Sequence, residues 1–561
     1  MNYEKNYDLW KKNYSKLGKE LQSMFDNLTE TEKKEAFATE LEFGTAGLRG
    51  ILGAGTGRMN IFTVRRATLA FIKFLKSRFS EYQLKTKGIV IGCDNRKWGL
   101  AFQKDITQIF ASFNIKTKIF PNDQFVPTPI ISFSVKTADC VGGIVITASH
   151  NPKIYNGYKI YDENGCQYLP DETNAISKYY NVIQSEVFNN FSNDKKDLIT
   201  VLDNSIRNKY EIMIKKMQFH PDMKKTIKIV FSNLHGTGRD WTPVILKELG
   251  YEVIIVAEQY EYDEEFTNAP KPNPEILSNY DLAIDYAKKN DADLIILNDP
   301  DADRIGIGVK TSDGKYQLLT GNETAPILLE YWLSQHKAAD KLPTNAVMYN
   351  TFVTGDLSDR VAEKWGVKIV KTLTGFKWIG SRIPLEKQRN LSFIFGFEEA
   401  YGYVLNPATR DKDGIQSSIV LAEACNYFAS KNKTMTDILE DIYQEFGYYY
   451  CFTVNEIYEG LEGRMIINKM LKVLRSAKIK TLNNLKCIKK EDYLDGLHDM
   501  PAQDLLKFYF EDGTWVAVRA SGTEPKIKFY YVAVSKESLL KAQEKQEKMH
   551  NDLKNNFLNN L

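Results

Sequence analysis

The chain has 561 residues, of which 43% are hydrophobic and 26% are charged, the balance of an ordinary globular protein. At roughly one domain per 100–200 residues, this length predicts three to five domains. Its 74 lysines and arginines against 72 aspartates and glutamates leave a formal net charge of +2, so the basic excess typical of a nucleic-acid-binding protein is missing.

The six cysteines are scattered and never form a Cys-x-x-Cys pair. This spacing favours neither a zinc site nor a disulfide framework, and it suits a reducing compartment. The polar N-terminus does not fit a signal peptide, and no apolar run approaches the ~20 residues of a membrane span. We therefore expect a soluble cytoplasmic protein with no membrane or nucleic-acid partner.

Short apolar strands alternate with helical patterns over most of the chain, which is typical of βαβ units. Helices are predicted at 64–79 and 281–289, and buried strands at 88–92, 142–147, 226–231, 251–256 and 294–297. Further along, strands at 514–518 and 527–534 alternate in a way that fits an antiparallel sheet open on one face. The tail, 536–561, is predicted to form a charged helix.

Charged, turn-rich stretches near 195–206, at 311–314 and at 443–447 are the predicted domain boundaries. The predicted fold class is α/β: three α/β domains with parallel or mixed sheets, followed by a smaller C-terminal α+β domain. The four domains are expected at 1–205, 206–318, 319–446 and 447–561.

Ser149 lies in the run 145–152 (VITASHNP), directly after a predicted strand, with His150 beside it and Lys159 ten residues later. A hydroxyl beside basic groups predicts a nucleophile on a surface cleft loop. The alternative is an ordinary turn that ends a strand. No Gly-x-Ser-x-Gly elbow or acidic partner supports a hydrolase triad. Lys159 supplies a positive charge or, with a lowered pKa, accepts a proton.

Three carboxylates, Asp299, Asp301 and Asp303, directly follow the strand at 294–297. Alternate residues of an extended segment share a face, so the three can meet at one ion. All-oxygen ligation favours Mg²⁺ over zinc or copper. An EF-hand is excluded because it needs Gly where Arg304 stands and Glu where Lys310 stands. A solvated loop without an ion remains the alternative.

Two further segments carry groups that suit a phosphorylated sugar. The run 519–526 (RASGTEPK) offers an arginine, two hydroxyls, a glycine and a lysine, which together make a phosphate cradle; a hairpin turn with surface charges is the alternative. The run 395–403 (FGFEEAYGY) places two carboxylates among aromatics, as sugar-binding loops and buried ion pairs both do. Arg49, within the glycine-containing run 43–50, is positioned to meet an anion.

In this order, these segments resemble those of the α-D-phosphohexomutase superfamily, the phosphoglucomutases and phosphomannomutases. The resemblance implies four domains around one central cleft and an isomerase, an intramolecular phosphotransferase of carbohydrate metabolism. It implies conversion between sugar 1-phosphates and 6-phosphates (5-phosphates for pentoses) through a phosphoserine and a bisphosphorylated sugar. It also implies one Mg²⁺ per subunit, a sugar bisphosphate activator, a small phosphosugar as partner, and a monomer or dimer.

The resemblance also assigns roles to individual positions. The implied catalytic residues are Arg49, Ser149, His150, Lys159 and Arg304. The implied metal ligands are Ser149, which carries the phosphate, Asp299, Asp301 and Asp303. The implied substrate-binding residues are Thr374, Gly375, Lys377, Glu398, Ala400, Lys412, Arg519, Ser521, Gly522 and Thr523.

One position departs from the family pattern. Members that discriminate hexose phosphates most often place Ser two residues after the first Glu of the sugar loop, and here that residue is Ala400. The loop is closer to the branch that includes phosphopentomutase. Because a missing hydroxyl weakens hydrogen-bond discrimination, glucose, mannose and pentose phosphates all stay open as substrates. The rival functions are a sugar-phosphate phosphohydrolase and a non-catalytic sensor, although Ser149 and Lys159 weigh against the sensor.

Overall fold

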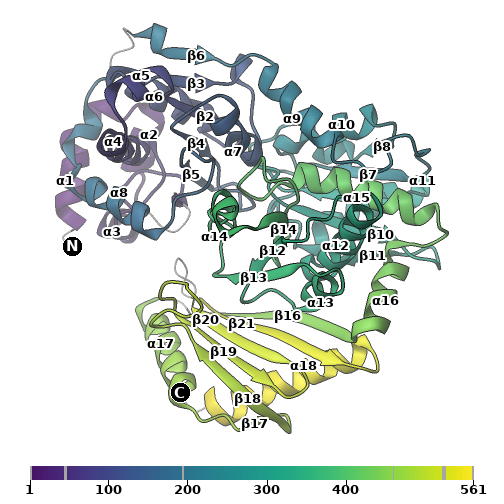
Figure 1. Ribbon diagram of the computed structural model, residues 1–561. Coiled ribbons are helices and arrows are strands. Elements are labelled where there is room, and N and C mark those ends of the chain that lie inside the picture. Colours follow the sequence, from purple (N-terminus) through teal and green to yellow (C-terminus); the bar gives the residue numbers. More distant parts are fainter. Residues whose placement is uncertain (1–2, 43–46, 192–194, 459, 521–525, 559–561) are drawn as a thin grey trace. The chain divides into compact units, whose positions relative to one another are not determined.

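The computed structural model describes residues 3–42, 47–191, 195–458, 460–520 and 526–558 (Figure 1). The chain divides into two compact units, one of residues 1–320 with 375–432 and the other of residues 321–374 with 433–561. Both units therefore take part of the predicted third domain, 319–446, and the predicted domain boundaries stay predictions.

The first unit begins with a mixed six-stranded sheet. Its strands lie in the order β1 (Leu48–Ile51), β5 (Tyr155–Tyr161), β4 (Gly142–Ile146), β2 (Ile89–Cys93), β3 (Thr117–Ile119) and β6 (Ile199–Val201). On one face, Ile89 and Ile91 share a core with helices α4 (Ile61–Arg78), α6 (Gly99–Ser112) and α8 (Pro170–Val182). On the other, Gly143 lies against Val135 of α7 (Thr128–Thr137). Strand residues thus alternate between two helical layers.

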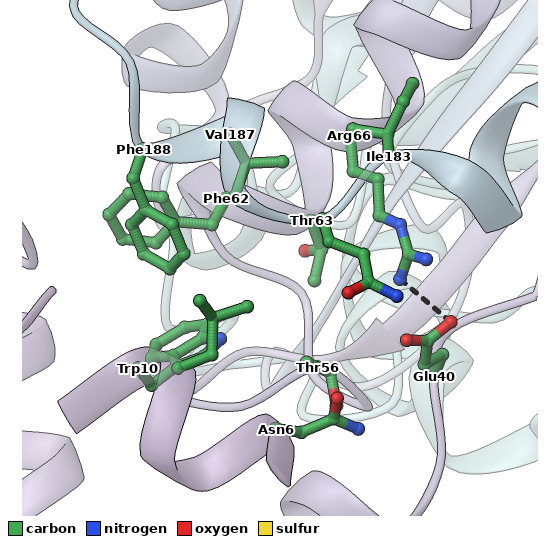
Figure 2. A pocket seen from close by; sticks show the side chains of 12 residues that line it. Asn6, Trp10, Glu40, Thr56, Phe62, Thr63, Arg66, Ile183, Val187 and Phe188 are labelled. Atoms are coloured by element: carbon green, nitrogen blue, oxygen red, sulfur yellow. Dashed lines mark ion pairs between the residues drawn. The ribbon is translucent and has the colours of Figure 1, made fainter. Parts of the chain in front are cut away.

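Helices α1 (Tyr3–Lys12), α2 (Lys19–Asp26) and α3 (Glu30–Ala38) precede this sheet, and α5 (Glu81–Thr86) follows α4. Trp10 packs edge-on against Phe62 and Phe188, with ring centroids 5.4 and 6.3 Å away. These rings line a cavity of about 30 Å³ (Figure 2), which has room for no more than a few waters. The Arg66–Glu40 ion pair at 2.9 Å lies at its polar end. Aromatic contacts therefore tie the N-terminal helices to the first sheet's core.

A second sheet of the first unit has the strand order β11 (Tyr316–Leu319), β10 (Ile305–Lys310), β9 (Leu294–Asn298), β7 (Lys228–Ser232) and β8 (Glu252–Ile255). Strand β7 is parallel to β8 and β9, whereas β10 is antiparallel to β9 and β11. The helices of this part are α9 (Ser205–Lys215), α10 (Thr242–Glu248) and α11 (Asp281–Asn290). Ala283 and Ala287 of α11 share a core with Val230 and Ile295.

The first unit closes with residues from later in the chain. Strands β14 (Ser392–Glu398) and β15 (Gly402–Val404) form an antiparallel pair. Helix α14 (Lys377–Gly380) precedes them, and α15 (Gly414–Ala429) follows and contacts β9 and β10. This arrangement brings the predicted sugar loop into the same compact unit as the serine and aspartate loops.

The second unit contains helices α12 (Gly321–Ala338), α13 (Leu357–Lys364) and α16 (Met435–Phe446) and the parallel strands β12 (Ala346–Thr351) and β13 (Lys368–Thr372). Its C-terminal sheet has the order β16 (Tyr448–Ile457), β21 (Lys526–Ser535), β20 (Trp515–Ala520), β19 (Leu505–Phe510), β18 (Leu485–Asp492) and β17 (Thr481–Leu482). Helices α17 (Gly460–Ser476) and α18 (Leu539–Leu553) pack on one face, where Leu471 and Met549 meet Phe508 and Phe529.

These elements confirm the α/β fold class and the predicted strands. The strand predicted at 226–231 is β7, Lys228–Ser232, and the one predicted at 527–534 is β21, Lys526–Ser535. The helices predicted at 64–79 and 281–289 are α4 and α11, and the charged tail forms α18. The antiparallel C-terminal sheet is also confirmed. Among the described residues, no helix combines the length and apolar character needed to cross a bilayer.

Candidate active site

Ser149 lies in the loop between β4 and β5 and has a left-handed backbone, with φ of 52°. This conformation is uncommon for a residue with a side chain. The Ser149 N–H donates to Thr147 Oγ1 at 2.8 Å, and that hydroxyl donates to Asp94 Oδ2 at 2.5 Å. Only 3% of Ser149 is exposed. The side chain is therefore buried within the loop that was predicted to line a cleft.

The serine hydroxyl joins the two motifs that the sequence singled out. Ser149 Oγ donates to Asp299 Oδ2 at 2.9 Å and lies 3.1 Å from His150 Nδ1. Burial, followed by the charges of Arg304 and Arg49, lowers the pKa of His150 well below its usual range. His150 is therefore neutral, and its ring nitrogen can accept a hydrogen bond from the serine.

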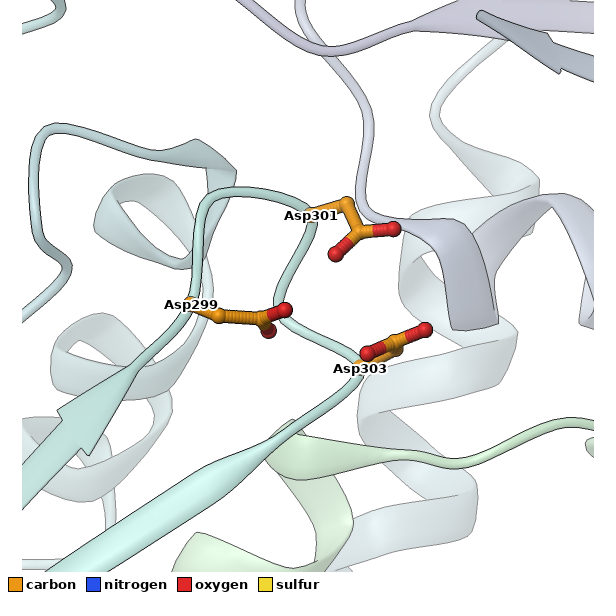
Figure 3. A group of neighbouring side chains, drawn as sticks. All are labelled: Asp299, Asp301 and Asp303. Atoms are coloured by element: carbon orange, nitrogen blue, oxygen red, sulfur yellow. The ribbon is translucent and has the colours of Figure 1, made fainter. Parts of the chain in front are cut away.

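Asp299, Asp301 and Asp303 converge, as Figure 3 shows, and one carboxylate oxygen from each lies within 4.8 Å of the others. The sequence-based reason for this convergence is wrong, because the segment is not extended. It is a tight turn between the antiparallel strands β9 and β10, with Ala302 at a φ of 51°. The turn rather than strand alternation therefore aims the three side chains at one point.

Backbone contacts hold this turn in place. Thr237 donates to the Pro300 carbonyl through its N–H at 2.7 Å and through its hydroxyl at 2.8 Å. A Cβ on Gly236 would lie 2.2 Å from Pro300 Cα, so the approach requires glycine. On the other side, Thr128 at the start of α7 donates its hydroxyl to Asp301 Oδ2 at 2.8 Å. Helix α7 and the loop after β7 thus hold the aspartate turn from both sides.

Two lysines face the carboxylates. Lys159 Nζ lies 2.8 Å from Asp301 and 3.4 Å from Asp303, and Lys412 Nζ lies 3.1 Å from Asp303. Burial disfavours the charge on Lys159, but Asp301 and Asp303 outweigh it and raise the pKa of Lys159. The raised pKa favours the predicted role of Lys159 as a fixed positive charge over its alternative role as a proton acceptor.

The aspartates fit a hard divalent cation. Asp301 Oδ1 and Asp303 Oδ1 are buried and have no hydrogen-bond partner among the described residues, and leaving charged oxygens buried and unpaired is costly. Burial, then the charges of Asp301 and Asp303, raise the pKa of Asp299 well above its usual range. A cation at this point would relieve both costs, and an all-oxygen donor set suits Mg²⁺ or Ca²⁺.

Two arginines border the serine loop. Arg49, on β1, donates from Nη1 to Asn151 Oδ1 at 3.0 Å. Arg304 donates its backbone N–H to Asp299 Oδ1 at 2.9 Å, and its Nη1 donates to Glu275 at 2.6 Å. The predicted catalytic residues thus lie on the two loops that carry Ser149 and the aspartates, and on the paired strands β1 and β5.

The predicted sugar loop lies at the end of β14. Glu398 Oε1 accepts from the Gly375 N–H at 2.6 Å. Burial raises the pKa of Glu398 to about 7, against the lowering effect of Lys412. Lys377 is buried with no hydrogen-bond partner for Nζ among the described residues, and burial lowers its pKa to about 8. Ala400 is half-buried between β14 and β15. The pKa values of Glu398 and Lys377 are thus both shifted, as those of binding-site residues often are.

The other predicted substrate contacts are not tested here. Thr374 and Arg519 belong to the second unit, where Arg519 lies opposite Lys528 on the neighbouring strand. Ser521, Gly522 and Thr523 lie outside the described residues. Their assignment to the substrate's phosphate stays a prediction.

Sequence reasoning missed Asp94, Arg96 and Thr128. Asp94 and Arg96 directly follow β2, which is parallel to β4 and adjacent to it. Ligand sites of open α/β sheets lie at the carboxyl ends of such strands, so this position was a usable signal. Thr128 gave no such signal, because its partner Asp301 is 173 residues away.

Family models match four consecutive stretches of the chain. Those described as "Phosphoglucomutase/phosphomannomutase, alpha/beta/alpha domain" I, II and III match residues 40–186, 208–314 and 320–446. The one described as "Phosphoglucomutase/phosphomannomutase, C-terminal domain" matches residues 470–548.

Individual proteins match over nearly the full length. Phosphoglucomutase of Staphylococcus epidermidis (strain ATCC 12228) is 34% identical over 531 residues, 91% of this chain and 94% of that protein. The structure of pp63/parafusin, a phosphoglucomutase from Paramecium, has a TM-score of 0.69 at 20% identity and covers 92% of this chain and 94% of its own. A phosphoglucomutase/phosphomannomutase family protein from Burkholderia thailandensis has a TM-score of 0.66 at 19% identity, with 92% and 98% covered.

Proposed function

The chain belongs to the phosphoglucomutase/phosphomannomutase family, and from that premise we propose that it is a Mg²⁺-dependent phosphoglucomutase or phosphomannomutase that works through a phosphoserine at Ser149. Membership confirms the resemblance predicted from the four motifs. It also makes the chain a phosphohexomutase, an isomerase that transfers a phosphoryl group within a sugar phosphate.

One observation carries the phosphoserine proposal: Ser149 Oγ lies 2.9 Å from Asp299, in a cluster where two carboxylate oxygens have no hydrogen-bond partner among the described residues. Mg²⁺ bound by Asp299, Asp301, Asp303 and the phosphorylated Ser149 would neutralise the charge of the phosphoryl group as it moves. A hydroxyl inside a metal-binding cluster is placed to carry a phosphoryl group.

The chain's own residues then position the reaction. Phosphorylated Ser149 gives its phosphoryl group to the free hydroxyl of the sugar monophosphate, and the proton of that hydroxyl passes to the released Ser149 oxygen. The resulting sugar bisphosphate reorients and returns its other phosphoryl group to Ser149, which gives up the proton again. Lys159 and Arg304 keep positive charge beside the moving group, an electrostatic effect that is large in a buried site. His150, neutral and 3.1 Å from Ser149 Oγ, is placed to take the serine proton during rephosphorylation.

The remaining predicted residues bind the parts of the sugar that do not react. Glu398 accepts from ring hydroxyls, and Lys377 and Lys412 meet a phosphate. Arg519, Ser521, Gly522 and Thr523 grip the distal phosphate, since the intermediate must be held in both orientations. A sugar bisphosphate acts as activator by phosphorylating Ser149, with one Mg²⁺ per subunit. We place the enzyme in the cytoplasm, as a monomer or dimer.

The preferred sugar is the open part of the proposal. Ala400 removes a hydroxyl from the sugar loop, which keeps phosphopentomutase as the alternative activity. Assaying glucose, mannose and ribose 1-phosphates side by side, with a trace of sugar bisphosphate, separates these activities. Release of inorganic phosphate instead of an isomer would favour the phosphohydrolase.

The phosphoserine is tested with Ser149→Ala. We expect turnover to fall to background and intact-mass analysis to show one phosphate on the native chain and none on the variant. Ser134→Ala is a matched control, because Ser134 is buried and its hydroxyl has no partner among the described residues. A Ser149→Ala enzyme with native turnover would overturn the proposal.

A further inference from the structure

One buried arginine organises the backbone of the serine loop. Arg96 is 2% exposed and directly follows β2. Its Nη1 donates to the carbonyls of Pro152 at 3.0 Å and Tyr155 at 3.1 Å. Its Nη2 donates to the carbonyls of Ser149 and Asn151. A single guanidinium therefore binds four carbonyls of the loop that carries the nucleophile.

The guanidinium is itself held from two sides. Its Nε lies 3.2 Å from Asp94 Oδ2, the oxygen that also accepts from Thr147 Oγ1. That hydroxyl in turn accepts from the Ser149 N–H. On the other side, the ring of Phe266, from the loop that follows β8, lies 4.9 Å from Arg96 Cζ. A displacement of the Arg96 side chain would therefore break contacts with both the serine loop and the loop that carries Phe266.

We propose that Arg96 is a positioning residue for the phosphoryl-transfer step, which rests on the proposed function of Ser149. Ser149 has an unfavourable backbone conformation, and such conformations persist only where the surroundings enforce them. Arg96 enforces it by drawing the loop carbonyls inward, which aims Ser149 Oγ at Asp299. The planar fork of five donors makes arginine the one side chain able to bind all four carbonyls.

The proposal predicts a loss in the chemical step rather than in binding. Arg96 contacts the loop backbone, Asp94 and Phe266, and none of the described residues predicted to bind the sugar, so we expect substrate affinity not to depend on it. A small displacement of a reacting atom slows a reaction strongly, by up to about 100-fold for 1 Å. Ser149 Oγ must be positioned accurately twice in each cycle, once when it gives the phosphoryl group and once when it receives it.

Arg96→Lys tests the proposal, with Arg65→Lys as the matched control. Arg65 also pairs with a carboxylate, Asp105, at 2.7 Å and donates to a backbone carbonyl, that of Val187, at 3.2 Å, but it lies on α4. We expect Arg96→Lys to lower kcat about 10- to 100-fold with KM changed less than about threefold. Arg65→Lys should keep kcat within about twofold of the native value.

Intact-mass analysis after incubation with glucose 1,6-bisphosphate measures the concentration of chains that become phosphorylated, which we call competent sites. Dividing the maximal rate by this concentration gives kcat per competent site. A native kcat per competent site in Arg96→Lys, or a loss confined to KM, would overturn the positioning role. If Arg96→Lys does not fold, Asp94→Asn decides, because it removes the charge that orients Arg96. A lowered kcat with native KM then supports the role, and a native kcat overturns it.

Ser149→Ala keeps the two proposals separable. If Ser149→Ala is active, the phosphoserine function falls. If Ser149→Ala is inactive while Arg96→Lys has the native kcat, only the positioning role of Arg96 is contradicted.

Discussion

Two groups of charged residues, one in each compact unit, differ in how completely their carboxylates are satisfied. In the second unit, Lys371 Nζ lies 2.8 Å from Asp356 Oδ1 and 2.6 Å from Asp359 Oδ2. Trp515 Nε1 donates to Asp356 Oδ2 at 2.6 Å, and Asn350 donates to Asp359 Oδ1 at 2.7 Å. Every carboxylate oxygen of this group, which we call the closed cluster, has a partner within the chain.

Asp299, Asp301 and Asp303 in the first unit form an open cluster, because Asp301 Oδ1 and Asp303 Oδ1 have no hydrogen-bond partner among the described residues. Native proteins satisfy nearly all buried polar groups, so each exception needs an explanation. The carboxylates of the closed cluster are satisfied within the chain, whereas those of the open cluster fit the proposed cation. Unsatisfied oxygens, rather than buried charge as such, therefore mark the site.

Two buried lysines give the same lesson. Burial lowers the pKa of both Lys377 and Lys507 to about 8. Lys507 Nζ donates to the Phe352 carbonyl at 2.7 Å and lies 3.7 Å from the centroid of the Trp515 ring, whereas Lys377 Nζ has no hydrogen-bond partner among the described residues. A shifted pKa alone would not distinguish the predicted substrate-binding lysine from the structural one.

The largest expected effect is that of Asp301→Asn in the open cluster. We expect turnover to fall roughly 10²- to 10³-fold, the range for removing one group that stabilises transition-state charge. Excess Mg²⁺ should restore part of the lost turnover. Metal-free stability should also fall, by about 3 kcal/mol, because the substitution leaves the buried Lys159 with less compensation. Native activity without added metal would point to a loop that binds nothing.

Asp356→Asn in the closed cluster should lower stability but leave turnover unchanged. Removing one partner of this half-buried ion pair leaves Lys371 with less compensation, which costs roughly 1–3 kcal/mol of folding free energy. Denaturant unfolding measures that loss, and steady-state assays on the folded fraction should give native kcat and KM. A loss of kcat with unchanged stability would mean that the closed cluster also takes part in the reaction.

A pH profile tests whether Glu398 acts in its ionised form. Because burial raises the pKa of Glu398 to about 7, kcat/KM should rise with pH through this value as the carboxylate forms. The ionisation should disappear in Glu398→Gln, while that of the substrate phosphate, with a pKa of about 6, remains. Identical profiles would exclude Glu398 as the titrating group.

The sign of the stability effect follows from the same pKa. The folded-state pKa of Glu398, about 7, lies above the ordinary value of 4.5, so the folded chain holds the proton more tightly. Between pH 4.5 and about 7, the folded state binds more protons than the unfolded state. The ionised carboxylate therefore destabilises the folded chain, and this destabilisation grows as the pH rises through that range. Glu398→Gln should become more stable than the native chain over this window.

The smallest expected effect is that of Ala400→Ser. A new hydroxyl adds about one neutral hydrogen bond, ~0.5–1.5 kcal/mol, and should shift relative efficiency toward hexose phosphates by up to about tenfold. The native enzyme should use glucose 1-phosphate well and mannose and pentose 1-phosphates measurably. Unchanged ratios of efficiency among these sugars would mean that Ala400 only packs in its turn.

Much of this arrangement was predictable from local sequence. Runs of apolar residues predicted β2, β4, β7, β8 and β9. The prediction of burial is wrong for β8, which lies at the edge of its sheet and is only partly buried. The grouping of Asp299, Asp301 and Asp303 was also predicted, but for the wrong reason, since spacing fixes which residues are near and not the turn that aims them.

The long-range contacts were not predictable in the same way. The burial of Ser149 depends on loops far away in the sequence, and the partnership of Thr128 with Asp301 spans 173 residues. A single sequence carries no record of such pairings. Asp94 and Arg96 are intermediate cases, because their place after a central strand was visible whereas their contacts with the serine loop were not.

The most direct measurement is calorimetric titration of Mg²⁺ into the native chain, Asp301→Asn and Asp356→Asn. We expect one Mg²⁺ per chain in the native protein and in folded Asp356→Asn, with affinity at least about tenfold weaker in Asp301→Asn. Equal affinity in the native chain and Asp301→Asn, or loss of binding in Asp356→Asn alone, would contradict the assignment of the open cluster as the metal site.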